Sequence, residues 1–141
     1  MQAADIIHCI DLTSLSGYES DADIIKLCQD AATPLGSVAA ICIYPQYLQL
    51  AKVHVPHGVK LATVVNFPLG QDSPHQVLLD VKSALALGAD EIDVVINYQE
   101  VLGGNLDHSA ALVAKVKALA GDRFVKVILE TGVLVDPDLI F

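Results

Sequence analysis

Strand-like and helix-like segments alternate along the whole chain, and this alternation restricts the possible folds more than any other feature. Each strand–helix unit spans about 25 to 30 residues, which is typical of a strand joined to a parallel neighbour through a helix. Such alternation predicts a parallel sheet with right-handed crossovers. We expect strands at residues 6–12, 37–44, 59–66, 90–96 and 125–130, and helices at 21–31, 45–53, 73–87 and 107–119, with a further helix beginning near 136.

Two folds are compatible with about five such units. Eight units would close into a (β/α)8 TIM barrel of roughly 250 residues, whereas this chain has 141 residues. The rival of matching length is a doubly wound open sheet, similar to a flavodoxin-like binding domain. A nucleotide-binding sheet of that kind would carry a glycine-rich turn after its first strand, and Asp11–Gly17 lacks one. No linker interrupts the pattern, so we expect a single domain over residues 1–141.

Composition and charge exclude several classes of function. Hydrophobic residues make up 53% of the chain and charged residues 18%, which fits strands that are buried on both faces. The net charge is -9, and the eight Lys and Arg residues form no basic cluster. Nucleic acids and anionic membrane surfaces are therefore not expected as partners. No apolar run reaches the roughly 18 residues of a membrane span, and no secretory signal is visible.

The histidines and cysteines also argue against common kinds of site. The five histidines have no metal-binding spacing, so no metal site is expected. Cys9, Cys28 and Cys42 have no close paired spacing. Unpaired cysteines in a chain of this length indicate reduced thiols and a cytoplasmic protein.

Two charged residues interrupt otherwise apolar strands: Asp93 within 88–97 and Lys126 within 124–132. Burying a lone charge is costly, so such residues are usually paired or functional. On neighbouring strands they can share one cleft, where an acid moves protons and a lysine acts as an amine nucleophile or proton shuttle. The alternatives are a structural acid at Asp93, and an ion pair of Lys126 with Asp93 or Glu130 that has no chemical role.

Further candidate residues occur in the first two strands. Asp11 ends the first strand and Thr13 follows it, and the active sites of β/α barrels are built at the carboxyl ends of the strands. A helix cap or a turn acid is the alternative interpretation of Asp11. Cys42 lies in the apolar segment 39–44, where a small buried hydrophobic residue is the default interpretation.

Taken together, five segments resemble the deoxyribose-phosphate aldolases, a family of class I aldolases. The resemblance implies a TIM barrel that reversibly cleaves 2-deoxy-D-ribose 5-phosphate to D-glyceraldehyde 3-phosphate and acetaldehyde, without a metal or cofactor, in deoxyribonucleotide catabolism. Because the match covers about five βα units, we expect a truncated partial barrel that lacks strands six to eight. The matching segments recur in order over nearly all of the chain: Ile10–Thr13, Ala39–Pro45, Val65–Gly70, Gly88–Asn97 and Lys126–Gly132.

The resemblance also implies a role for each matched residue. Asp93 matches the residue that donates and accepts protons. Lys126 and Asp11 match residues of the polar network of the site. Cys42 and Thr13 match residues that bind the substrate. In the family, the lysine that forms the Schiff base lies on the sixth strand, and the last two strands grip the phosphate. This chain contains no Schiff-base lysine segment, so we expect it to be inactive alone.

Two other functions remain open. In one, Lys126 itself forms the imine, with Asp93 as its acid–base partner. In the other, the chain is a non-catalytic module, because five parallel strands cannot close a barrel. Its open strand edges and exposed apolar interior would favour a homo-oligomer that associates through those edges.

Overall fold

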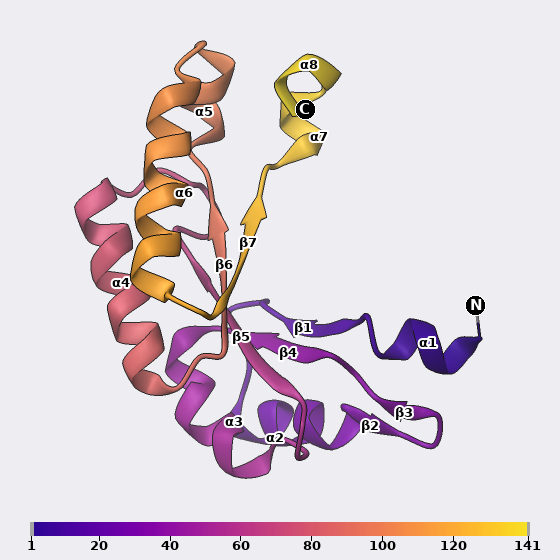
Figure 1. The fold of residues 1–141 in the computed structure, drawn as a ribbon. Coiled ribbons are helices and arrows are strands. Elements are labelled where there is room, and N and C mark those ends of the chain that lie inside the picture. Colours follow the sequence, from indigo (N-terminus) through magenta and orange to yellow (C-terminus); the bar gives the residue numbers. More distant parts are fainter. Residues whose placement is uncertain (1, 141) are drawn as a thin grey trace. The chain divides into compact units, whose positions relative to one another are not determined.

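The computed structural model describes residues 2–140, and five parallel strands alternate with helices along them (Figure 1). The strands of this sheet are β1 (Asp11–Ser14), β4 (Ala40–Ile43), β5 (Lys60–Val65), β6 (Glu91–Val95) and β7 (Phe124–Ile128). A separate antiparallel pair consists of β2 (Ala32–Thr33) and β3 (Gly36–Ser37). The helices are α1 (Ala3–Ile7), α2 (Asp21–Asp30), the 3-10 turn η1 (Pro45–Tyr47), α3 (Leu48–His54), α4 (Pro74–Leu87), α5 (Tyr98–Leu102), α6 (Leu106–Ala120), α7 (Thr131–Leu134) and α8 (Pro137–Ile140).

The order of the strands distinguishes between the two folds that the sequence allowed. It is β1-β4-β5-β6-β7, so each new strand of the sheet pairs with the strand before it. The β1–β4 and β4–β5 pairs are parallel, with Asp11 opposite Ala40 and Ala40 opposite Lys60. A β/α barrel is assembled in this order, whereas a doubly wound sheet reverses its order at a switch point. The arrangement therefore agrees with consecutive units of a barrel.

The chain divides into two compact units. The first contains the residues before Val64 together with Ala84–Glu91, and the second contains Val64–Ser83 and the residues from Ile92 onward. In the first unit, α2 packs against α3. All four residues of β4 are buried, as expected of a parallel strand that is covered on both faces.

The second unit has a hydrophobic core of its own. It consists of residues from the end of β6, from α5 and from α7: Val95, Ile96, Tyr98, Val101 and Leu134. The Ile96 N–H donates a hydrogen bond to the Ile128 carbonyl at 3.2 Å, which joins the residue after β6 to the end of β7. These contacts fix the backbone from which Asn97 and α5 begin.

The expected first strand was wrong over residues 6–10 and overlaps the observed strand only at residues 11 and 12. Residues 6–12 were expected to be extended, but Ala3–Ile7 form α1 and β1 begins only at Asp11. The Gln2 N–H donates to the Asp5 carboxylate at 2.8 Å, and such capping stabilises a helical start. The apolar residues of this segment therefore belong to a short helix, which their pattern alone does not distinguish from a strand.

Short elements were missed at three further places. Ser37 was expected to begin the second strand, but it pairs with Ala32 in the β2–β3 hairpin, so β4 begins at Ala40. The helices α5 and α7 were not expected at all; they have five and four residues. Elements this short do not complete enough turns to show a helical pattern of apolar residues.

The Glu19 carboxylate organises the turn between β1 and α2. It accepts hydrogen bonds from the N–H groups of Ser16 at 2.6 Å and Gly17 at 3.1 Å, and from the Ser14 hydroxyl at 2.9 Å. Desolvation alone would raise the pKa of Glu19. Hydrogen bonds from backbone N–H groups, including its own, and from serine hydroxyls outweigh desolvation and lower the pKa from 4.5 to about 2.

We expect the variant Glu19→Gln to be less stable than the wild type at pH 7. Because the folded-state pKa is depressed, the carboxylate contributes stability that is complete above its ordinary pKa of 4.5 and is lost as the pH falls towards about 2. Urea unfolding at pH 7, 4 and 2.5 measures this contribution. The difference in the free energy of unfolding between the wild type and Glu19→Gln should shrink each time the pH is lowered. A difference that is the same at all three pH values would contradict this role of Glu19.

Candidate active site

Asp93 of β6 and Lys126 of β7 form an ion pair in the second unit. The Lys126 Nζ atom lies 3.2 Å from Asp93 Oδ1. The Asp93 side chain is 13% exposed and the Lys126 side chain 37% exposed, so the acid is largely buried while the lysine reaches solvent. The pairing is one of the alternatives that the sequence left open. A catalytic role for either residue stays a prediction.

The chemistry open to this pair follows from its two functional groups. Opposite charges at this distance stabilise each other's ionised form. An ionised carboxylate only accepts hydrogen bonds, and an ammonium group only donates them. The pair therefore places a proton acceptor beside a proton donor. These are the two groups that general acid–base catalysis requires.

The other predicted site residues lie together in the first unit. Thr13 is opposite Cys42 in the parallel register of β1 and β4, and Asp11 is two residues before Thr13. Side chains at alternate positions of a strand share one face, so Asp11, Thr13 and Cys42 lie on the same face of this pair of strands. Cys42 is 3% exposed, Asp11 is half-buried and Thr13 is exposed. A role in substrate binding stays a prediction for Cys42 and Thr13.

Asn66 is a residue whose structural importance the sequence interpretation missed. It follows β5 and is 4% exposed. Its side-chain amide donates to the Val95 carbonyl at 2.8 Å and accepts from the Asp72 N–H at 2.9 Å. Asn66 therefore ties the loop between β5 and α4 to the end of β6. A polar residue directly after a mostly apolar strand was the available signal.

A second feature that the sequence did not indicate is a pocket of about 130 Å³ in the second unit. Its lining comes from the start of α4, from the segment after β6 and from the first turns of α6. Asp93 and Lys126 do not line it. Because the polar groups come from three segments that are far apart in the sequence, no local motif predicts the pocket.

Among residues 2–140, no group of three or more His, Cys, Asp or Glu side chains is arranged to hold a metal ion. In the same part of the chain, no helix has both the length and the apolar character that crossing a bilayer requires.

Comparisons with known proteins relate nearly all of the chain to aldolases. Residues 5–139 match the family model described as DeoC/LacD family aldolase. A provisionally assigned deoxyribose-phosphate aldolase from Coccidioides immitis has a TM-score of 0.86 and 30% identity, covering 93% of this chain and 51% of that chain. One from Toxoplasma gondii ME49, also provisionally assigned, has a TM-score of 0.83 and 28% identity, covering 95% and 52%.

The deoxyribose phosphate aldolase from Aeropyrum pernix, which is described as having a unique tetrameric structure, has a TM-score of 0.67 and 30% identity. The match covers 92% of this chain and 54% of that one. The chain thus spans about half the length of the solved structures that it matches.

Proposed function

This chain belongs to the DeoC/LacD family of aldolases, and we propose that it provides part of the active site of a 2-deoxy-D-ribose 5-phosphate aldolase. The expected fold is confirmed: five parallel strands alternate with helices and match about half of TIM-barrel aldolase chains. Family membership implies phosphorylated sugar substrates. The proposed reaction is the reversible cleavage of deoxyribose 5-phosphate to glyceraldehyde 3-phosphate and acetaldehyde, in the breakdown of deoxyribonucleotides in the cytoplasm.

The ion pair between Asp93 and Lys126 is the single observation that carries this proposal. Both residues belong to segments in which the sequence resembles the aldolases, and their charged atoms lie 3.2 Å apart. Family membership alone would also fit a chain that had lost its site. A largely buried carboxylate held beside a partly exposed lysine supports a retained acid–base centre.

Each site residue has a distinct part in the proposed mechanism. The imine of a class I aldolase withdraws the electron pair of the breaking carbon–carbon bond. Asp93 takes the proton from the sugar hydroxyl whose carbon becomes the aldehyde, and it returns a proton to the enamine carbon. Lys126 holds Asp93 in its ionised form and, with Asp11, belongs to the polar network. Cys42 and Thr13 line the place where substrate binds.

The lysine that forms the imine is not assigned to any residue of this chain. The resemblance places it on a sixth strand, and the sheet described here has five. We therefore propose that these 141 residues do not cleave the substrate by themselves. Imine formation by Lys126 is the competing possibility, and it would give turnover without any further strand.

A chimera tests the proposed function. Residues 1–141 would replace the matched 54% of the Aeropyrum pernix aldolase, which then supplies the remaining strands. Cleavage of deoxyribose 5-phosphate is measured through reduction of the glyceraldehyde 3-phosphate that it releases. A chimera with native circular dichroism should cleave the substrate, whereas a folded chimera without activity would count against the proposed function.

A second candidate function is self-association, and an apolar groove in the second unit favours it. The groove has a volume of about 700 Å³. It is lined mainly by apolar residues of α5 and α6, of β7 and the residue after it, and of α8, including Leu106, Val113, Val127, Leu129 and Leu139, and Lys117 also lines it. The sheet order gives β7 one neighbouring strand, β6, within residues 2–140. An apolar surface beside a sheet edge is a typical site of association, and we propose that a second copy of this chain covers it.

We expect the purified chain to elute as a dimer or larger oligomer in size-exclusion chromatography with light scattering. Val127→Lys places a charge in the groove and should weaken association by roughly tenfold or more, since a buried unpaired charge is strongly unfavourable. Val133→Lys is the matched control, because Val133 is 40% exposed and does not line the groove. A wild-type chain that is monomeric at 100 µM, roughly the concentration at which weak homodimers form, would rule out the self-associating module.

A further inference from the structure

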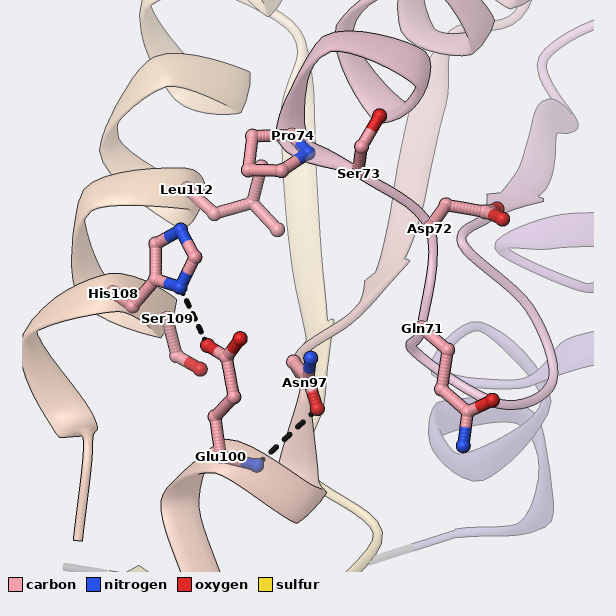
Figure 2. Close-up of a pocket in the computed structure, with 9 residues that line it drawn as sticks. All are labelled: Gln71, Asp72, Ser73, Pro74, Asn97, Glu100, His108, Ser109 and Leu112. Carbon is pink, nitrogen blue, oxygen red and sulfur yellow. Dashed lines mark hydrogen bonds and ion pairs between the residues drawn. The ribbon is translucent and has the colours of Figure 1, made fainter. Parts of the chain in front are cut away.

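The pocket beside α6 has the features of a binding site that is separate from the proposed aldolase chemistry. Figure 2 shows its lining residues, which come from the loop before α4, from Asn97 and α5, and from α6; the side chains of Glu100, His108 and Ser109 lie close together. Its volume is about 130 Å³. Since a water molecule occupies about 30 Å³ in the liquid, the pocket holds a ligand of about four non-hydrogen atoms.

One buried hydroxyl in this pocket lacks a partner. Ser109 is 7% exposed, and among residues 2–140 its Oγ atom has no hydrogen-bond partner. Figure 2 shows this hydroxyl pointing toward the Glu100 side chain. Buried polar groups are nearly always hydrogen-bonded, and an exception calls for a missing partner. A ligand in the pocket is the partner that the lining residues themselves do not supply.

The Glu100 carboxylate gives the pocket its charge. Its Oε2 atom lies 2.6 Å from His108 Nδ1, and the Glu100 side chain is 33% exposed. The backbone N–H of Glu100 donates to the Asn97 side chain at 3.2 Å, which holds the start of α5 in place. With one carboxylate oxygen bonded to His108, the second oxygen, Oε1, is left to receive a hydrogen bond from a ligand.

The chemistry of the lining selects the charge of the ligand. No lysine or arginine lines the pocket, and Asp72 lines it with a carboxylate that points away from Glu100 in Figure 2. A carboxylate whose one basic partner is an imidazole disfavours an anion and favours a cation. Oxygen acceptors suit an ammonium group, which only donates hydrogen bonds. Pro74 and Leu112 provide apolar surface for a short alkyl chain.

We propose that this pocket binds a small primary alkylammonium compound. The ammonium group donates hydrogen bonds to Glu100 Oε1 and to Ser109 Oγ, and the alkyl chain lies against Pro74 and Leu112. The proposal is independent of the aldolase function, because neither Asp93 nor Lys126 lines the pocket.

Three probes of similar size test the proposal: n-propylammonium and 1-propanol, which have the same number of non-hydrogen atoms, and propionate, which carries the opposite charge. Each is titrated into the ¹⁵N-labelled chain at pH 8, where ordinary imidazoles are neutral, and binding is read from amide shifts. Propylammonium should shift the amides of Glu100 and Ser109 and bind roughly tenfold more tightly than propanol, because its hydrogen bonds are charge-assisted. Propionate should leave these amides unchanged.

Three variants separate binding from folding. Glu100→Gln should bring propylammonium down to the affinity of propanol while the spectrum stays dispersed. Ser109→Ala should weaken binding about threefold or more and leave the stability unchanged or higher, because it removes a buried hydroxyl that has no partner. Asp107→Asn, next to the pocket in α6 but outside its lining, should bind as the wild type does.

Three results would overturn the proposal. One is equal binding of propylammonium and propanol by the wild type. Another is undiminished propylammonium binding by Glu100→Gln, and the third is a set of shifted amides that lies away from Glu100 and Ser109.

Discussion

Replacing Gly70 with alanine is expected to cost about 3 kcal/mol or more of the free energy of unfolding, because it combines backbone strain with a steric clash. Gly70 has a φ of 67°, and a Cβ atom there would lie 2.1 Å from the backbone oxygen of Ile96. Its N–H also donates to the Asn66 carbonyl at 2.8 Å. The loop cannot move away from Ile96 without breaking the contacts that Asn66 makes. Urea unfolding measures the loss.

Gly104→Ala is the matched control for this variant. Gly104 also has a positive φ, at 85°, but a Cβ atom there would meet nothing within 4 Å. It should cost only about 1 kcal/mol, which is the backbone strain alone. Equal losses for the two variants would mean that Gly70 does not lie against Ile96.

In the active chimera with the Aeropyrum pernix aldolase, Asp93→Asn is expected to lower kcat for cleavage by about 10²- to 10⁴-fold, the usual contribution of a general acid–base group. The amide keeps the size of the carboxylate but neither accepts nor returns a proton. Because the Asp93 side chain is 13% exposed, bulk water cannot readily take its place. The rate of glyceraldehyde 3-phosphate release, followed over a range of substrate concentrations, separates the effect on kcat from that on KM.

Asp30→Asn provides the comparison for the Asp93 variant. Asp30 pairs with Lys26 at 2.8 Å in α2, and both side chains are more than half exposed. Removing a surface ion pair changes stability little, so kcat should stay within about twofold of the unmodified chimera. A chimera whose rate survives Asp93→Asn would leave Asp93 with a structural role only.

The long elements could be predicted from the sequence because burial imposes a pattern on them. The β5 strand was expected at 59–66 and occurs at Lys60–Val65, where five of the six residues are buried. The α4 helix was expected at 73–87 and occurs at Pro74–Leu87. In α4 the apolar residues follow the helical period, whereas β5 is a nearly continuous apolar run, which is typical of a parallel strand buried on both faces.

The short elements could not be predicted, because contacts outside their own sequence decide them. The residues of α1 would also suit a strand, and capping by Asp5 selects the helix. The β2–β3 hairpin has two residues in each strand, and the Thr33 hydroxyl bridges its turn by donating to the Gly36 carbonyl at 2.7 Å. No periodicity is visible in segments of this length.

The candidate site was predictable only where a charge interrupts an apolar strand. Asp93 and Lys126 stand out for that reason, and the structure brings their charged atoms to 3.2 Å. The 130 Å³ pocket gives no such signal: Glu100 and Ser109 lie on separate helices, α5 and α6, whose polar residues look like an ordinary solvated surface. Only the assembled second unit places them in one pocket.

The central claim is that the chain holds the proton-transfer residues of an aldolase site but not the lysine that forms the imine. Borohydride trapping with acetaldehyde tests this claim most directly. The purified chain of 141 residues is treated with both reagents, digested and analysed by peptide mass spectrometry, beside an assay of deoxyribose 5-phosphate cleavage. The account predicts no turnover and no specific adduct on any lysine. A stoichiometric adduct on Lys126 together with turnover would contradict it, because Lys126 would then be the imine-forming residue.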